Sequence, residues 1–354
     1  MCTRYANYPA AMVEADAPAR QSAAPRSPRP AAAGHCRGVA ACRARRPSML
    51  SPDLLRTITE NGVVAHGSIP PGLPWWQAWS FDPTLLIPAA LVGWFYFRGL
   101  RRWEGRTREH PWWRTALFYA SLGTYLLAME SPIDRLGVHH FSMHMIQHEL
   151  VMMYAVPMML LGAPTTPLLR GIPGWLQQGV VRPLAGRTAF RLAYRGLTHP
   201  AVAIFCMTAV VWAWHLVPGW WEASLNDQVV HDVQHVSFTI VSMLFWWNVI
   251  DPKPLHSRIA HLPRVLYIFG GSLPKHILAA MVTFAPHPFY PTYEAARRVL
   301  PIDPATDQQL AGLIMWVPSE GITLLAMAVV FFMWLRISER RQKREDDRLR
   351  RAAV

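Results

Sequence analysis

The chain has 354 residues, of which 52% are hydrophobic, only 16% are charged and 16 are tryptophan. Soluble domains carry about 25% charged residues, so this composition argues against an ordinary soluble enzyme or binding domain. Most of the net charge of +13 lies in two basic tails, residues 1–48 and 336–354. Basic tails that flank apolar segments are typical of membrane topology signals. No nucleic-acid-recognition motif accompanies them in the sequence, so we expect no nucleic-acid partner.

The N-terminal leader is rich in Ala, Pro and Arg and lacks the apolar core of a secretory signal peptide. We expect residues 1–80 to be mostly disordered, as a basic leader and pre-membrane segment. Met49 is a plausible alternative start. Three of the four cysteines lie in the leader and no CxxC occurs, so cysteine spacing indicates neither a zinc site nor a disulfide framework.

Seven apolar stretches are long enough, or nearly so, to cross a hydrocarbon core of roughly 30 Å. They are Thr84–Phe97, Trp112–Met129, Phe141–Leu161, Ala201–Val217, Val233–Ile250, Val265–Ala285 and Leu310–Leu335. Pro157, Pro274 and Pro318 interrupt three of them, and membrane helices tolerate such prolines as kinks. The sequence therefore predicts an all-α membrane protein in which residues 81–335 form a bundle of about seven transmembrane helices.

The basic residues between these stretches predict the orientation of the bundle. In chain order the six connections hold five, one, five, zero, three and two Lys or Arg, and the C-terminal tail holds eight. Positively charged connections remain on the cytoplasmic side. We therefore expect the N-terminus outside and residues 336–354 as a basic cytoplasmic tail.

With this topology, eight of the 15 histidines gather near the outer ends of the helices. They are His139, His140, His144, His148, His215, His231, His235 and His287. His144/His148 and His231/His235 are each four residues apart, so each pair shares one helix face. Two imidazoles on one face can bind one metal ion, and a third ligand from another helix would complete a trigonal or tetrahedral site. We predict a metal or redox site to which His215 also contributes.

Side chains beside the first histidine pair refine this prediction. Its nearby methionines are Met143, Met145, Met152 and Met153. Imidazole together with thioether is a donor set that suits copper. Glu149 and Asp232 adjoin the two pairs and could orient imidazoles as hydrogen-bond acceptors. Asp303 and Asp307 precede the last helix and could face the cluster.

Ionisable residues within an apolar stretch are a further candidate site, because charges inside a membrane are costly. Lys275 and His276 lie in the middle of the sixth stretch, beside Pro274. Glu320 in the seventh stretch is a possible partner for Lys275, either as a structural ion pair or on a proton path. Eight tryptophans occur as four adjacent pairs, at 75–76, 112–113, 220–221 and 246–247, and indicate interfacial belts.

Several of these motifs together resemble one known family. The stretch from His144 to His148 reads His-Met-Ile-Gln-His, and Ala-Val-Pro157 and Leu-Leu-Gly-Ala-Pro164 follow it. Trp-Ala-Trp-His215, His-Asp-Val-Gln-His235 and the segment from Asp307 to Trp316 extend the likeness, which covers roughly residues 81–335. In this combination the sequence resembles the CtaG (caa3-type) cytochrome c oxidase assembly factors.

The resemblance implies a multi-pass protein of the bacterial inner membrane that takes part in oxidase maturation and has no catalytic activity of its own. Its expected partners are the lipid bilayer and cytochrome c oxidase subunits, and its expected metal is copper. Carried over to this sequence, the candidate copper ligands are His144, His148, His215, His231 and His235.

Other interpretations remain open at this stage. Paired HxxxH motifs also occur in membrane desaturases and hydroxylases, but those histidine boxes lie on the cytoplasmic side. A haem-binding electron-transfer protein would need one histidine from each of two helices, which the two pairs can supply. A transporter built around Lys275 and Glu320 is a third alternative.

Overall fold

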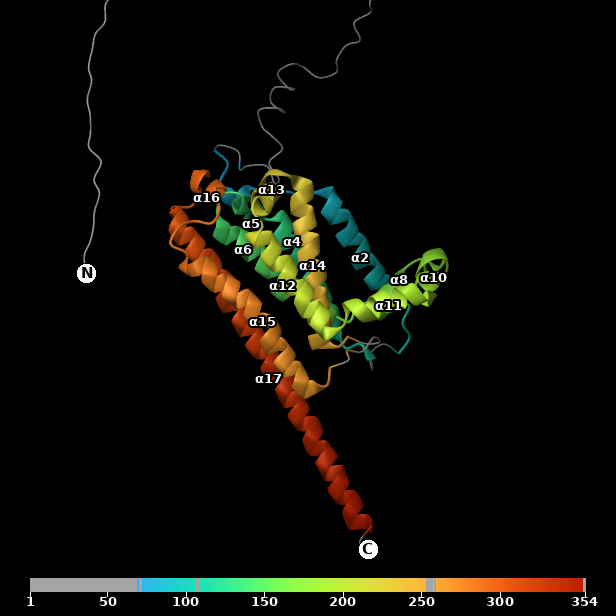
Figure 1. Cartoon of the computed structure of the whole chain (residues 1–354). Helices are drawn as coiled ribbons and strands as arrows, with labels where there is room; N and C mark the ends of the chain where they lie inside the picture. The colour runs from blue at the N-terminus through green and yellow to red at the C-terminus, as the bar shows by residue number, and fades with distance from the viewer. Residues whose placement is uncertain (1–68, 70–71, 106–108, 253–256, 258, 353–354) are drawn as a thin grey trace, which may run out of the picture. The chain divides into compact units, whose positions relative to one another are not determined.

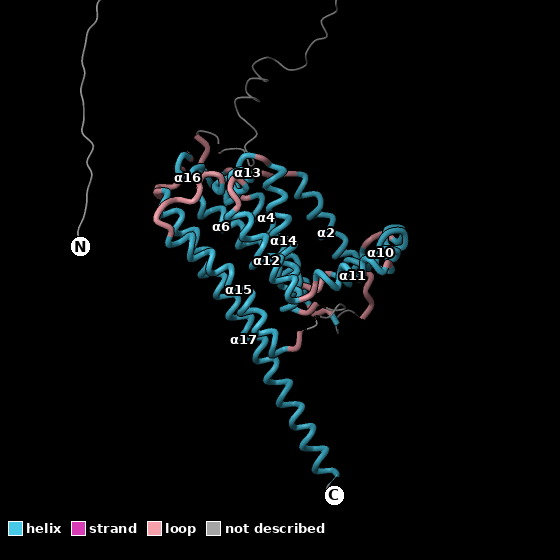
Figure 2. The backbone as a smooth tube through the Cα atoms, in the orientation of Figure 1, coloured by secondary structure: helices cyan, strands magenta, loops and turns pink. Residues whose placement is uncertain are grey.

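The structure is a computed structural model that describes Ile69 and residues 72–105, 109–252, 257 and 259–352. Of residues 1–80, predicted to be a mostly disordered leader and pre-membrane segment, the structure describes Ile69 and residues 72–80, which include the short helix η1. The three cysteines of the leader and Met49 lie outside the described residues, as do Lys253, Arg258, Arg106 and Arg108. The described ranges are mostly helical, with loops and turns between the helices, and contain no strand (Figure 2). The predicted all-α class is therefore confirmed for this part of the chain.

The helices follow one another through the described residues with short connections (Figure 1). In chain order they are η1 (Trp75–Gln77), α2 (Pro83–Arg101), α4 (Trp112–Glu130), α5 (Pro132–Gly137), α6 (Phe141–Glu149), the π-helical η2 (Leu150–Ala155), α7 (Val156–Leu161), α8 (Thr165–Gly171), α9 (Gly174–Leu176), the π-helical η3 (Gln177–Val181), α10 (Arg182–Gly186), α11 (Thr188–Leu197), α12 (Pro200–Leu216), α13 (Trp220–Asn226), α14 (Gln228–Ile250), α15 (His261–Phe284), α16 (Pro291–Ala295) and α17 (Pro304–Ala352).

Each of the seven predicted apolar stretches is helical. By length and apolarity, four helices can cross a membrane alone: α2, α14, α15 and α17. Two bent pairs raise the number to six, namely Phe141–Leu161 with α8, bent by 70°, and α11 with α12, bent by 69°. Helix α4 is not among them; it opens with two aromatic residues, Trp112 and Trp113, followed by Arg114. The structure thus supports four to six spans, and the seventh stays a prediction.

The connections alternate between two ends of the bundle. Helices α5, α13 and α16 lie at one end, where the connections carry few basic residues (Figure 1). Helix α8 and the arm formed by α9, η3, α10 and α11 lie toward the other end, and α17 continues beyond that end through the basic tail to Ala352. The histidine-bearing starts of α6 and α14 lie at the first end, which we call the histidine end; we call the other the basic end.

Two pairs of helices approach so closely that only glycine fits between them. A Cβ atom at Gly312 of α17 would overlap Thr283 of α15, and one at Gly99 of α2 would overlap the Pro167 carbonyl of α8. These two glycines place backbone against backbone, where a side chain would force the helices apart. Helices α15 and α17 therefore pack tightly against each other, and Lys275 lies on α15.

At Pro157, where the sequence predicts a kink, the type of helix changes. Proline 157 has no N–H, so it cannot donate to a carbonyl one turn earlier. In the π-helical η2, the Val156 N–H instead donates to Val151 O, five residues back. The freed carbonyl of Met152 accepts hydrogen bonds from Ser242 Oγ at 2.6 Å and Trp246 Nε1 at 3.1 Å. These bonds tie α14 to the segment just after His148, at a π-helical turn of the kind often found at functional sites.

Candidate metal centre

Four imidazoles meet between α6 and α14 at the histidine end. His144 and His148 lie one turn apart on α6, and His231 and His235 lie one turn apart on α14. All four side chains are buried, with exposed fractions of 2%, 3%, 0% and 1% in that order. The predicted i,i+4 pairs therefore face each other across one helix interface and are shielded from solvent.

The ring nitrogens of these histidines converge. The two Nε2 atoms of His144 and His148 are 3.0 Å apart, and those of His231 and His235 are 2.8 Å apart. Across the interface, one nitrogen from each of His144, His148 and His235 lies within 4.8 Å of the others. Nitrogens bound to one metal at about 2.0–2.1 Å in a tetrahedral site are about 3.3 Å apart. The nitrogen separations within the two pairs are therefore close to those in a coordination site.

Tyrosine 293 of α16 supports the first of these imidazoles. Its hydroxyl donates to Gly137 O at 3.0 Å and lies 3.3 Å from His144 Nδ1. Burial raises the pKa of Tyr293 well above its usual value, so the phenol keeps its single proton. Because the phenol donates its proton to the Gly137 carbonyl, its oxygen accepts a hydrogen bond from His144 Nδ1. The neutral His144 ring then has its lone pair on Nε2, which faces the cluster. No sequence motif indicated this role for Tyr293.

In that tautomer His148 donates from Nε2 to His144, and its own Nδ1 carries the lone pair. This Nδ1 atom is buried without a hydrogen-bond partner in the described part of the chain. A buried nitrogen lone pair that no donor satisfies is uncommon in proteins and is suited to a metal ion. The donor set of the cluster therefore fits a metal that prefers imidazole.

His215 of α12 lies beside the four-histidine cluster and not in it. Its Nδ1 is 2.7 Å from the Val211 carbonyl, and its ring centroid lies 4.8 Å from that of Trp221. The same indole lies 4.7 Å from the His144 ring. The structure thus brings four of the five predicted ligands together and places His215 next to the indole that borders them.

The walls of the cluster are aromatic. Trp221 is 1% exposed, stacks on Tyr290 at 4.9 Å and adjoins His144. Phe238 packs edge-on against His148 at 4.6 Å. The prediction that Trp221 belongs to an interfacial belt is wrong, because this indole lines the cluster; Trp246, whose Nε1 donates to Met152, is also interior.

Among the predicted thioether ligands, Met145, Met152 and Met153 are buried in the core that surrounds the cluster. Met143 instead packs against Leu136, Ile69 and Ala78 in a separate cluster. It follows that Met143 is on a different face of α6 from His144, as its sequence position one residue earlier requires.

Asp307 of α17 caps the start of α6. Its carboxylate accepts hydrogen bonds from the N–H groups of Phe141 at 2.9 Å and Ser142 at 3.1 Å, and lies 3.7 Å from His140 Nδ1. A carboxylate at a helix N-terminus satisfies free N–H groups and complements the helix dipole. Asp307 therefore faces the histidine end as predicted, but its contacts there are with His140 and the helix start; Asp303 caps α17 itself.

The predicted Lys275–Glu320 pair is wrong. Lys275 Nζ of α15 pairs with Glu149 Oε1 of α6 and donates to Ser319 Oγ of α17 at 2.6 Å, while Ser319 donates to Glu149 Oε2 at 2.6 Å. Glu320 lies 3.2 Å from His276 Nε2 instead. Adjacent residues on a helix point about 100° apart, so the same turn of α17 directs Ser319 inward and Glu320 outward.

The acidic residues next to the two histidine pairs, Glu149 and Asp232, have other partners. Glu149, the residue after His148, bonds to both Lys275 and Ser319, which also bond to each other. These three side chains join α6, α15 and α17. Asp232 is at the surface and accepts from Gln228 Nε2 at 2.9 Å. In the described structure, neither carboxylate is bonded to an imidazole of the cluster.

Comparison with known proteins places this fold in a family. The family model for the cytochrome c oxidase caa3 assembly factor (Caa3_CtaG) matches residues 94–337, which include all four clustered histidines. An uncharacterized protein of Mycobacterium leprae is 23% identical over 289 residues, and one of Mycobacterium bovis is 22% identical over 275 residues. Each match covers 76% of this chain and 41% of the relative, so the chain spans about two fifths of the length of these relatives. No solved structure matches it significantly. The chain is a membrane protein that belongs to the cytochrome c oxidase caa3 assembly factor family.

Proposed function

We propose that this protein assists cytochrome c oxidase assembly by holding copper at the four-histidine cluster and passing it to an oxidase subunit. The observation that carries the proposal is the convergence of His144, His148 and His235, with ligand nitrogens within 4.8 Å of one another. Family membership supports the oxidase as the client. Copper is the cargo in this proposal, and the protein supplies binding and release.

Imidazole nitrogen is a good donor for copper, and the buried thioethers of Met145, Met152 and Met153 add soft ligands nearby. The cluster is enclosed by Trp221, Phe238 and Tyr290. An apolar enclosure excludes water and competing hard cations, which favours a soft ion such as Cu(I). Release to a partner then requires movement at the histidine end.

The proposed orientation places the histidine end outside the cytoplasm and the basic end inside. The support is the alternation of basic residues between the two ends of the bundle. A reporter enzyme fused after Val354 tests this: we expect activity only from a reporter that works in the cytoplasm, and activity only from an exported reporter would reverse the topology.

The copper proposal is tested by titrating the purified full chain with Cu(I) against a chromophoric Cu(I) chelator. We expect His148→Ala and His235→Ala each to weaken Cu(I) binding at least about tenfold, because each removes one of the converging imidazole ligands. His287→Ala is the matched control, since His287 is exposed on the connection after α15, outside the cluster. Wild-type affinity in both cluster variants would contradict the proposal.

A cellular test separates copper binding from oxidase assembly. A strain that lacks this protein is complemented with wild type, His148→Ala/His235→Ala or His287→Ala, and cytochrome c oxidase activity is measured with and without added copper. We expect the double variant to fail and added copper to restore part of the activity. Full activity of the double variant would show that the cluster is not needed for assembly.

The haem alternative predicts a different optical property. Trp221 and Phe238 lie 4.6–5.8 Å from the His148 ring, in space that a porphyrin between α6 and α14 would have to occupy. We therefore expect the purified protein to have no Soret band. A Soret band that is lost in His148→Ala would favour haem over copper.

A further inference from the structure

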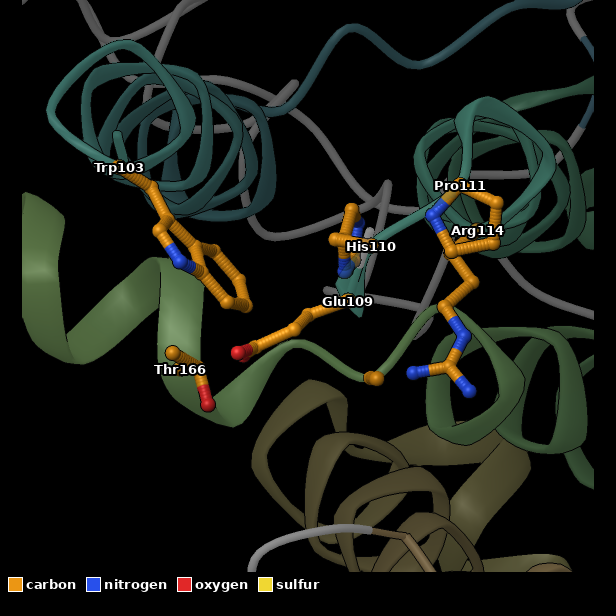
Figure 3. A pocket seen from close by; sticks show the side chains of 7 residues that line it. Trp103, Glu109, His110, Pro111, Arg114 and Thr166 are labelled. Atoms are coloured by element: carbon orange, nitrogen blue, oxygen red, sulfur yellow. The ribbon is translucent and has the colours of Figure 1, made fainter. Parts of the chain in front are cut away.

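A second polar site lies at the basic end, away from the four-histidine cluster. A pocket of about 560 Å³ is formed where α2 ends, α4 begins and α7 connects to α8 (Figure 3). Its lining residues are Trp103, Glu109, His110, Pro111, Arg114, Ala163 and Thr166. Nothing in the proposed copper chemistry uses this pocket.

The walls of the pocket are held rigidly. The buried His110 is 2.9 Å from Tyr96 Oη through its Nε2, and Tyr96 also donates to Gly162 O at 3.2 Å. Tyr96 stacks on Phe118 with ring centroids 3.7 Å apart. On the opposite wall, Arg170 lies over the Trp103 ring at 4.9 Å. A polar pocket with such fixed walls is preorganised for a ligand.

Two side chains of opposite charge reach this pocket without an ion-pair partner. Within the described residues, neither Glu109 nor Arg114 forms a salt bridge, and Arg114 Nε is buried without a hydrogen-bond partner. Figure 3 shows the Glu109 carboxylate directed toward Thr166 and Trp103, and the Arg114 guanidinium on the other side of the pocket. A ligand that satisfies both must carry a cationic and an anionic group a few ångströms apart.

The surroundings indicate a lipid. Trp112 and Trp113 at the start of α4 are 80% and 40% exposed, as is typical of aromatic residues at the membrane interface. Along the same two helices, an apolar groove runs from Phe97 and Tyr119 to Leu86 and Leu126. Phe97 lies one turn before Arg101, where α2 ends, and Trp103 follows two residues later. A charged pocket at the end of an apolar groove fits an amphiphile.

We propose that this pocket binds the phosphoethanolamine headgroup of a membrane phospholipid, with the phosphate on Arg114 and the ammonium on Glu109. An ammonium group has three N–H donors, which suit the Glu109 carboxylate and the Thr166 hydroxyl. The guanidinium of Arg114 matches phosphate oxygens. The acyl chains follow the groove between α2 and α4, and the lipid joins these two helices at the basic end.

The test is native mass spectrometry of the delipidated full chain titrated with phosphatidylethanolamine, phosphatidylcholine or phosphatidylglycerol of equal chain length. We expect the ethanolamine lipid to bind at least about tenfold more tightly than the other two, since it alone provides both a phosphate and N–H donors for Glu109. Equal binding of all three lipids, or preference for phosphatidylglycerol, would overturn the proposal. So would free phosphoethanolamine that binds as tightly as the lipid, because the pocket would then serve a soluble compound.

Two variants test the roles of Arg114 and Glu109 separately. Arg114→Gln is expected to weaken binding of both zwitterionic lipids about tenfold, whereas Glu109→Gln is expected to abolish only the preference for ethanolamine over choline. The exposed neighbours provide matched controls, Arg102→Gln and Glu104→Gln, which should bind like wild type. A misfolded variant cannot lose selectivity alone while it retains phosphatidylcholine binding. Unchanged selectivity in Glu109→Gln would contradict the assignment.

Discussion

Polar side chains are mostly buried at the histidine end of the bundle and mostly exposed at the basic end. At the histidine end, imidazoles, Asp307 and Tyr293 are buried; hydrogen bonds join α16 and α17 to α6, and the imidazole rings of α14 pack against those of α6. At the basic end, charged side chains are mostly exposed, and the arm from α9 to α11 has no buried residue. Burial of a polar group is costly unless its partners are in place. The histidine end therefore requires defined geometry, whereas the exposed arm from α9 to α11 tolerates variation.

The largest effect is expected at the buried ion pair between Lys275 and Glu149. Lys275→Ala removes the partner of Glu149 and leaves a buried carboxylate with only Ser319, so we expect a loss of about 3–5 kcal/mol in the free energy of unfolding. Thermal or denaturant unfolding in detergent measures it. Lys343→Ala on the exposed part of α17 is the control and should change stability by less than about 0.5 kcal/mol.

The double variant Lys275→Met/Glu149→Met sharpens this test. Replacing both members of a buried pair with apolar groups is often neutral, so the double variant should be more stable than Lys275→Ala alone. If Lys275→Ala is as stable as wild type, the buried ion pair does not hold α6 against α15.

The next effect concerns the packing of α15 against α17. Gly312→Ala inserts a methyl group against Thr283 and should cost about 1–3 kcal/mol, since helix backbones must separate. Gly321→Ala on the same helix meets no neighbouring atom and should stabilise the helix by up to about 1 kcal/mol. Opposite signs for the two substitutions, measured by thermal unfolding, are the expected result. A stabilising Gly312→Ala would refute the close packing.

A smaller effect is expected from the phenol that orients His144. Tyr293→Phe removes the acceptor for His144 Nδ1, and such an outer contact typically changes metal affinity about 10–100-fold. Tyr290→Phe is the matched control, because its hydroxyl donates to the His215 carbonyl and to no imidazole of the cluster. Competition titration with Cu(I) compares them. Equal affinities of the two variants would remove Tyr293 from the site.

The smallest effect is on pH dependence. Burial lowers the pKa of His139, on the connection before α6, below its ordinary value of 6.5, and Arg297 acts in the same direction. The unfolded chain then binds a proton at acidic pH that the folded chain excludes, so stability falls as the pH drops below the ordinary value. We expect His139→Gln to lose less stability than wild type between about pH 7 and about pH 5. An identical loss in both proteins would show that His139 does not contribute.

The helical periodicity of the sequence predicted which histidines share a helix face, because spacing along one helix is a local property. All seven apolar stretches are helices for the same reason. The sequence also predicted that Asp307 lies at the histidine end. The number of membrane spans does not follow from composition alone, since α4 begins with aromatic residues and Arg114, and α6–α8 and α11–α12 are bent.

Contacts between helices could not be predicted in the same way. Glu149 and Glu320 are equally plausible partners for Lys275 in the sequence, and only the packing of α6 against α15 and α17 decides between them. In the sequence, Trp221 resembles an interfacial tryptophan. Only the structure shows that its indole, on α13, lines the cluster. Tyr293 contacts His144 from another helix, and the π-helical turn after His148 bonds to α14. No local sequence pattern predicts these tertiary contacts.

The most direct test of the central claim is X-ray absorption spectroscopy of the purified full chain loaded with about one Cu(I) per chain. We predict imidazole scattering from at least two histidines, lost in His148→Ala/His235→Ala and unchanged in His287→Ala. Copper bound without imidazole ligands, or a spectrum that the double substitution leaves unchanged, would contradict the assignment of the four-histidine cluster as the copper site.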